Sequence, residues 1–251
     1  MLPSQIGLGP LGISTFGLFA FLAFFLGSFL LWRKLREDYP EEEILSLFIL
    51  ATLSALIGAR IIYSLDHLII FGFDLDKWLF FPRYPGFSLV GGYLGTAGFV
   101  YYWCKLKKWS LWVVADSFVQ SVLAILIIGN IGNLFLQTEL ITQPSSQVFT
   151  IANLLLAVLA LLLSFYFASK YRKFLWYKSG KPGFVATSIS AFYFLWFSVL
   201  DFSYQKSIYL ELVGALLTVL VALVLLYIRS DRILREDLSF LDNFKKIKFK
   251  I

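Results

Sequence analysis

Cysteine and histidine are almost absent from this chain, which has one of each, Cys104 and His67. A disulfide within the chain needs two cysteines, and a metal site built on cysteine or histidine clusters needs several such residues. Both are therefore excluded, and we expect neither a metal nor another cofactor.

Charged residues are scarce as well, at 15% of the 251 positions, whereas 59% of the residues are hydrophobic and the mean hydropathy is +0.78. A soluble domain of this length has too little interior to bury so much apolar surface. The composition therefore predicts a polytopic membrane protein.

Seven hydrophobic runs approach or exceed the length of about 20 residues that crosses a bilayer as a helix. They lie at 13–31, 44–65, 88–103, 111–136, 149–168, 184–200 and 208–228. We expect an all-α fold of seven transmembrane helices within residues 1–230, followed by a basic tail at 231–251. The first run has no basic residue before it and no small-residue cleavage site after it, so we predict a retained span rather than a signal peptide.

The basic residues are distributed unevenly between the two sets of loops. The segments after the first, third, fifth and seventh runs hold 18 of the 22 lysines and arginines. By the positive-inside rule, the N-terminus is predicted to lie outside and the C-terminus in the cytoplasm. The net charge of +6 is thus explained by topology, and nucleic-acid binding is disfavoured.

Polar side chains interrupt the run at 111–136. Asp116, Gln120 and Asn130 fall within about 40° of one line on a helix, and Asn133 lies at its edge. Polar groups inside a membrane usually face a cavity or a neighbouring helix. The segment is therefore expected to form part of a site, although the asparagines could also simply tie helices together.

Two further spans carry features that allow alternative interpretations. Arg60 lies in the outer half of its helix, where it needs a carboxylate, phosphate or carbonyl partner, or reaches the headgroups by snorkelling. Gly91 and Gly92 open another span, where they either allow close helix packing or leave room for a lipid headgroup.

The sixth and seventh runs place acidic residues at the predicted outer face. Tyr193 and Asp201 are eight residues apart and therefore share one face of a helix, and Glu211 begins the next run. Together with Arg60 and the asparagines, these residues could form one site, in which Asp201 or Glu211 neutralises Arg60.

Several motifs occur in the order seen in one family of membrane enzymes. They are IGLGP at 6–10, Phe16-Gly17, GARIIY at 58–63, GFSLVGG at 86–92, Ala115-Asp116, GNIGN at 129–133 and Glu139. With these motifs the chain resembles the bacterial prolipoprotein diacylglyceryl transferases. The resemblance implies a multi-pass protein of the bacterial inner membrane that moves a diacylglyceryl group from phosphatidylglycerol to the lipobox cysteine of a prolipoprotein.

The chain departs from the family pattern at several positions. Asn130 stands where the family has an arginine, Val90 where it has a histidine, and Phe197 where it has another arginine. Tyr193 matches the family, and Asp201 replaces a glutamate.

The resemblance and the polar residues together assign roles. We predict catalytic roles for Arg60, Asp201 and Tyr193, and lipid-binding roles for Gly91, Gly92, Asp116, Asn130, Asn133 and Glu139. The expected partners are phosphatidylglycerol or another anionic phospholipid, a prolipoprotein signal peptide and the membrane.

The family reaction requires a group that accepts the thiol proton and positive charge near the leaving phosphate. Asp201, Glu139 or His67 could accept the proton, and Lys77 or Arg83 could add to the charge of Arg60. Two hypotheses remain open: a divergent transferase, and a catalytically inactive homologue that binds phospholipid or a lipoprotein partner.

Overall fold

The structure is a computed structural model that describes residues 5–8, 11–72, 74–79, 84, 86–139, 144–177, 179–204 and 209–232. The described residues contain long helices of 19 to 29 residues, named here in chain order: α1 (Thr15–Leu35), α2 (Glu41–Asp66), α5 (Leu89–Lys107), α6 (Leu111–Glu139), α7 (Pro144–Lys170), α8 (Phe184–Tyr204) and α9 (Tyr209–Arg229). Shorter elements are strands β1 (Gln5–Leu8) and β2 (Leu11–Ser14), helices α3 (Leu68–Phe71) and α4 (Leu75–Leu79), and the 3₁₀ turn η1 (Tyr171–Lys173).

Six of the long helices are long and apolar enough to cross a membrane, counted over the described part of the chain. They are α1, α2, α6, α7, α8 and α9. The seventh predicted span corresponds to α5, in which four glycines and three tyrosines lower the mean hydropathy. The prediction of a helical protein with several spans is thus confirmed for six helices, and α5 as a span stays a prediction.

A short β-hairpin, which the sequence analysis did not predict, precedes the first long helix. Strands β1 and β2 pair antiparallel, with Gln5 opposite Ser14 and Leu8 opposite Leu11. The predicted first span included position 13, whereas α1 begins at Thr15. Hydropathy does not separate a short apolar strand from the start of an apolar helix, so the hairpin was missed.

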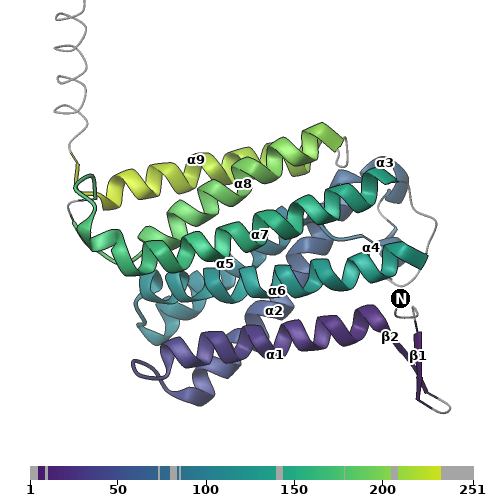
Figure 1. Ribbon diagram of the computed structural model, residues 1–251, viewed down its shortest axis with the longest axis horizontal. Coiled ribbons are helices and arrows are strands. Elements are labelled where there is room, and N and C mark those ends of the chain that lie inside the picture. The colour runs from purple at the N-terminus through teal and green to yellow at the C-terminus, as the bar shows by residue number, and fades with distance from the viewer. Residues whose placement is uncertain are drawn as a thin grey trace, which may run out of the picture.

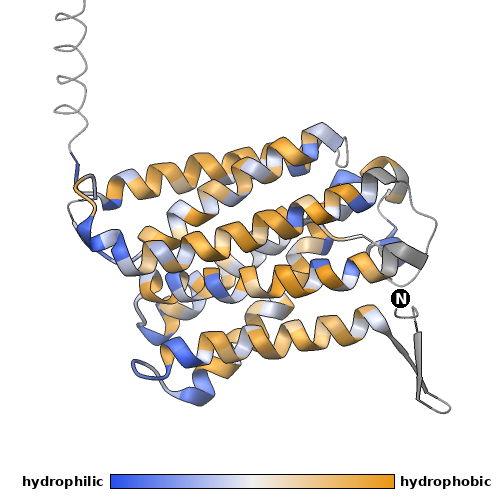
Figure 2. Cartoon of the chain, in the orientation of Figure 1, coloured by the Kyte–Doolittle hydropathy of each residue, from blue (hydrophilic) through white to orange (hydrophobic). Residues whose placement is uncertain are grey.

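The long helices lie side by side, with α8 between α7 and α9 (Figure 1). The principal neighbours are α1 and α6, α2 and α5, α8 and α9, α6 and α7, and α7 and α8. In α8, 67% of the most apolar 18-residue stretch is buried, against 22–39% of the corresponding stretch in the other five helices. The outer helices therefore present hydrophobic side chains outward, as lipid contact requires (Figure 2).

The turns between helices alternate between two ends of the bundle (Figure 1). One end, called the basic end, holds residues 33–40, 105–110, 170–177, 179–183 and 229–232, where hydrophilic residues gather (Figure 2). The opposite end, called the α3 end, holds the β-hairpin, α3 and α4. The basic end matches the segments predicted to be cytoplasmic, and orientation across the membrane remains a prediction.

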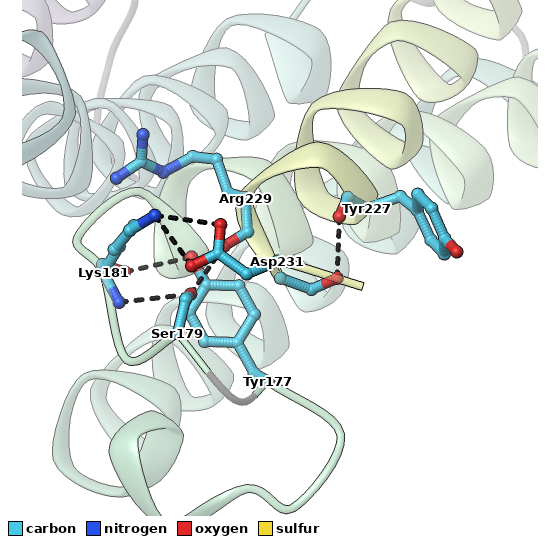
Figure 3. A network of polar contacts seen from close by, with 7 residues as sticks. Tyr177, Ser179, Lys181, Tyr227, Arg229 and Asp231 are labelled. Atoms are coloured by element: carbon cyan, nitrogen blue, oxygen red, sulfur yellow. Dashed lines mark hydrogen bonds and ion pairs between the residues drawn. The ribbon is translucent and has the colours of Figure 1, made fainter. Parts of the chain in front are cut away.

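Polar contacts tie the connection between α7 and α8 to the end of α9 (Figure 3). The Lys181 Nζ lies 2.7 Å from the Asp231 carboxylate, and the Ser179 hydroxyl donates to the Arg229 carbonyl over 2.5 Å. The Tyr177 hydroxyl donates to the Lys181 carbonyl over 3.0 Å. These bonds fix the basic end of α8 and α9 relative to each other.

Glycines allow α2 and α5 to approach backbone to backbone. A Cβ atom added at Gly58 would lie 2.5 Å from the Gly91 carbonyl oxygen, and one added at Gly91 would collide with the Gly58 carbonyl. The Ser54 hydroxyl donates to the Gly95 carbonyl over 2.9 Å. Such close contact is typical of small-residue helix packing in membranes.

Candidate functional site

A cavity of about 360 Å³ opens among the helices at the α3 end. Its described lining comes from the C-terminal halves of α2, α6 and α8 and from the N-terminal parts of α5, α7 and α9. The lining residues are Tyr63, Asp66, His67, Phe87, Ser88, Leu89, Leu126, Asn130, Phe149, Asn153, Tyr193, Phe197, Asp201 and Glu211.

Glu211 links two of the helices that form the cavity. Its carboxylate accepts a hydrogen bond from the Ser88 hydroxyl and another, 3.1 Å long, from the backbone N–H of Val90. Ser88 is also the N-cap of α5, because its oxygen accepts the N–H of Gly91 over 2.9 Å. The negative charge of Glu211 therefore lies at the positive N-terminal end of the α5 dipole.

His67 is the single imidazole of the chain, and it lies at the end of α2. Its Nδ1 is 3.0 Å from the Tyr63 carbonyl oxygen, and its ring stacks on the Tyr63 ring with centroids 4.1 Å apart. A carbonyl oxygen can only accept, so in the neutral ring Nδ1 carries the proton and Nε2 has the free lone pair. This tautomer allows His67 to accept a proton through Nε2.

Tyr193 and Asp201 both line the cavity and are buried, with 5% and 4% exposure. Their eight-residue spacing places them on one face of α8, as the sequence indicated. Asn130 lines the same cavity from α6, and its amide donates to the Leu126 carbonyl of its own helix over 2.8 Å. The structure therefore brings together Asn130, Tyr193, Asp201 and Glu211.

Arg60 lies beside the cavity and is not among its lining residues. The guanidinium donates to the backbone carbonyls of Lys77, Trp78 and Gly86 over 2.6, 2.8 and 3.0 Å. The partners of Arg60 are thus backbone carbonyls of the segment between α2 and α5, which is one of the partner types that the sequence allows. The expected pairing with Asp201 or Glu211 is not found among the described contacts of Arg60. The arginine is 8% exposed, and its bonds hold this segment against α2.

Asp116 lies at the basic end, far along α6 from the cavity residue Asn130. Its two carboxylate oxygens each accept a 2.7 Å bond, one from the N–H of Gly183 and one from the N–H of Ala186. These N–H groups belong to the start of α8, where they have no acceptor within the helix. Asp116 therefore caps α8 from a neighbouring helix.

The other predicted lipid-binding residues also lie away from the cavity lining. Gly91 and Gly92 face α2, where Gly91 meets the Gly58 backbone and Gly92 meets Ala55 and Ala59. Asn133 is partly exposed, and it is not one of the residues that line the cavity. The side chain of Glu139 lies outside the described residues. For Gly91 the structure favours the packing alternative.

Sequence reasoning missed Asn153 and Ser88. Asn153 is the only amide within the apolar run at 149–168, which was a usable signal for a polar site. Ser88 gave no such signal, because a serine beside a helix start is an ordinary cap. His67 was considered only as one of three possible bases, and the structure places it in the cavity.

Metal binding has no support in the described part of the chain, where no group of three His, Cys, Asp or Glu side chains is placed to share an ion.

Comparisons with known proteins agree with the geometry. Residues 3–241 match the family model described as prolipoprotein diacylglyceryl transferase. The phosphatidylglycerol–prolipoprotein diacylglyceryl transferase of Acinetobacter baumannii (strain SDF) is 31% identical over 157 residues, which cover 57% of this chain and 54% of the relative.

Two further curated relatives carry the same name. The protein of Idiomarina loihiensis is 31% identical over 134 residues, covering 53% of this chain and 50% of the relative. That of Acinetobacter baylyi is 29% identical over 148 residues, covering 55% and 51%. The matched part thus spans about half the length of each relative.

Proposed function

Because the chain belongs to the prolipoprotein diacylglyceryl transferase family, we propose that it transfers a diacylglyceryl group from a glycerophospholipid to the cysteine of a prolipoprotein signal peptide. The observation that carries this proposal is the cavity at the α3 end, which gathers Tyr193, Asp201 and His67 between membrane helices. Phosphatidylglycerol, the lipid in the names of the relatives, is the first donor to test.

The reaction joins the substrate sulfur to a glyceryl carbon. The thiolate of the substrate cysteine attacks the carbon that carries the phosphate ester, the carbon–oxygen bond breaks, and glycerol phosphate leaves when the donor is phosphatidylglycerol. The thiol proton must first pass to a base, since the thiolate is the nucleophile. The sulfur comes from the substrate, because Cys104 is buried near the basic end of α5.

His67 supports this step as the proton acceptor. Its Nδ1–H is occupied by the Tyr63 carbonyl, which leaves the Nε2 lone pair for the thiol proton. Asp201 and Tyr193, which line the same cavity, would orient the glyceryl group through hydrogen bonds.

For Arg60 we propose a positioning role. Its three bonds to the carbonyls of 77, 78 and 86 hold the segment that supplies the cavity residues Phe87 and Ser88. Its contribution to catalysis then comes through the shape of the cavity.

The second candidate function is binding without turnover. One observation favours it: none of the described residues that line the cavity is a lysine or arginine, and the amide Asn130 lies on the wall where the family has an arginine. Loss of one preorganised hydrogen-bond donor that stabilises the charge developing in the transition state typically lowers the catalytic rate by a factor of about 10²–10³. A protein of this kind would hold a phospholipid or a lipoprotein signal peptide in the cavity.

The test is incubation of the purified protein with phosphatidylglycerol and a lipobox peptide, followed by mass spectrometry. A thioether-linked diacylglyceryl peptide is expected with the cysteine peptide and not with its Cys→Ser version. Absence of product while phospholipid still co-purifies would leave the binding function.

We also propose the inner-membrane topology that the loops indicate, with seven spans including α5, the N-terminus outside and the C-terminus cytoplasmic. The basic end holds the segments rich in lysine and arginine, which supports a cytoplasmic location for it. The predicted basic tail at 231–251 lies almost wholly outside the described residues. Cysteines introduced at Arg36 and at Asp74 should react with an impermeant thiol reagent only from the cytoplasmic and the outer side, respectively.

A further inference from the structure

Two amide side chains lie on the described wall of the cavity, and they come from neighbouring helices. Asn130 belongs to α6 and Asn153 to α7. The Nδ2 of Asn130 donates to the Leu126 carbonyl of its own helix, which leaves its Oδ1 to offer to a bound molecule. The wall therefore holds neutral groups that can form hydrogen bonds with a ligand.

Asn153 lacks the partner that a buried amide normally has. Its side chain is 6% exposed, and its Oδ1 has no hydrogen-bond partner among the described residues. An unpaired buried acceptor costs free energy, and nearly all such groups in folded proteins are satisfied. A molecule bound in the cavity can supply the missing partner.

The chemistry of an amide restricts what that partner can be. The Oδ1 atom only accepts and the Nδ2 atom only donates, and a half-turn of the amide exchanges their positions. An ester or phosphate oxygen only accepts, and an ammonium only donates. A hydroxyl does both, so it can pair with the amide in either orientation.

We propose that Asn153 is a specificity-determining residue that recognises a hydroxyl in the headgroup of the phospholipid donor. The inference rests on the proposed function in placing a phospholipid in this cavity, and it does not require turnover. Asn153 then acts on which lipid is bound.

The size and position of the cavity favour a lipid headgroup as the source of this hydroxyl. Its volume of about 360 Å³ lies at the small end of the usual range for ligand sites. Phe87 lines the cavity and is 48% exposed, so the wall reaches the outer surface of the bundle. On α7 the side chains of Val148 and Ile151 are 48% and 45% exposed, and they provide apolar surface for acyl chains.

The test compares two lipids that differ only in the hydroxyls of the headgroup. Phosphatidylglycerol and phosphatidylpropanol with the same acyl chains have the same charge and a three-carbon headgroup, with and without hydroxyls. Native mass spectrometry of the delipidated protein measures both affinities. We expect phosphatidylglycerol to bind about tenfold more tightly, because the amide stays unpaired with the other lipid. Equal affinities would overturn the proposal.

Variants at Asn153 assign this preference to one side chain. Asn153→Leu should reduce the preference to about threefold or less by weakening phosphatidylglycerol binding alone. Asn153→Asp keeps an acceptor oxygen and should retain the preference, and its added charge cancels in the ratio because the two lipids carry equal charge. An unchanged preference in Asn153→Leu would overturn the proposal. Equal weakening of both lipids would also overturn it, since a merely structural role has that effect.

The matched control is Gln120→Leu. Gln120 is also a buried amide without a partner among the described residues, and it is not one of the residues that line the cavity. Both leucine variants replace an unpaired amide, so both should keep the melting temperature of the wild type. Loss of the lipid preference in Gln120→Leu to the same extent as in Asn153→Leu would contradict the proposal.

Two competition measurements identify the source of the hydroxyl. Displacement of phosphatidylglycerol by millimolar free glycerol would overturn the lipid assignment in favour of a soluble polyol. Weaker binding of a lipobox peptide to Asn153→Leu, with the lipid preference intact, would overturn it in favour of the peptide.

The transfer assay distinguishes this inference from the proposed function. Thioether product formed equally from both lipids, with no difference in their binding, would overturn the role of Asn153 and leave the transferase in place. A lipid preference that depends on Asn153, without product from either lipid, would support the inference and overturn turnover.

Discussion

The carboxylate of Glu211 accepts the backbone N–H of Val90 over 3.1 Å and thereby joins the start of α9 to the start of α5. Val90 occupies the position where the family has a histidine. In this chain the position has become part of the core, since the Val90 side chain is 1% exposed and its Cγ1 would lie 2.8 Å from a Cβ added at Gly214. The contact between Glu211 and the α5 backbone is therefore independent of the side chain at 90.

Replacement of Glu211 tests this junction. Glu211→Ala leaves the Ser88 hydroxyl and the Val90 N–H without their acceptor, and it should lower the free energy of unfolding by ~2–4 kcal/mol. Unfolding in a detergent titration, followed by circular dichroism, measures the change. Glu211→Gln keeps one acceptor oxygen and should therefore lose less stability than Glu211→Ala. Equal stability of Glu211→Ala and the wild type would show that the junction does not contribute to the stability of the fold.

Replacement of Arg60 tests how the segment between α2 and α5 is held. In Arg60→Ala three carbonyls lose their donor, so we expect this segment to open and trypsin to cleave faster after Lys77. Arg60→Lys should protect the segment from trypsin only partly, because an ammonium cannot reproduce the planar fork of a guanidinium. Arg36→Ala at the basic end is the control, and similar cleavage of the Arg60→Ala protein and this control would contradict the assignment.

Replacement of Asp116 tests the cap of α8. Asp116→Ala removes the acceptor of two N–H groups and should cost at least ~1–2 kcal/mol, the usual range for a lost cap. Asp116→Asn supplies one acceptor oxygen, so its stability should lie between that of the wild type and that of Asp116→Ala. The melting temperature measures the effect, with Asp38→Ala in the exposed turn after α1 as the control. If Asp116 acted only on lipid, the Ala variant would lose lipid and keep its melting temperature.

Two glycines of α5 form a matched pair for testing the α2–α5 contact. A methyl group at Gly91 would collide with the Gly58 backbone, whereas one at Gly98 would meet no atom within 4 Å. Gly91→Ala should therefore destabilise the protein by at least ~1–3 kcal/mol through overpacking. Gly98→Ala should be neutral or stabilising, since alanine is the better helix former. A lower melting temperature for Gly98→Ala than for Gly91→Ala would contradict the proposed packing.

Part of the candidate site could be predicted from the order of residues along single helices. The spacing of Tyr193 and Asp201 places both on one face, and Glu211 follows at the start of the next helix, so their meeting at one end was predictable. Asn153 was equally visible as a polar residue in an apolar run. Arg60 was placed at the correct end, but its partners were not predictable, because backbone carbonyls occur at every residue and leave no pattern in the sequence.

The sequence by itself determined where the long helices lie, because a hydrophobic run long enough to cross a membrane must satisfy its backbone hydrogen bonds internally. It also determined the asymmetry of charge between the two ends of the bundle. The tertiary structure alone decided that Asp116 caps α8, that Gly91 packs on α2, and that Asp66, Asn153, Asp201 and Glu211 share one cavity. Each of these depends on which helices are neighbours, and neighbours are chosen by packing across the whole bundle rather than by any one segment.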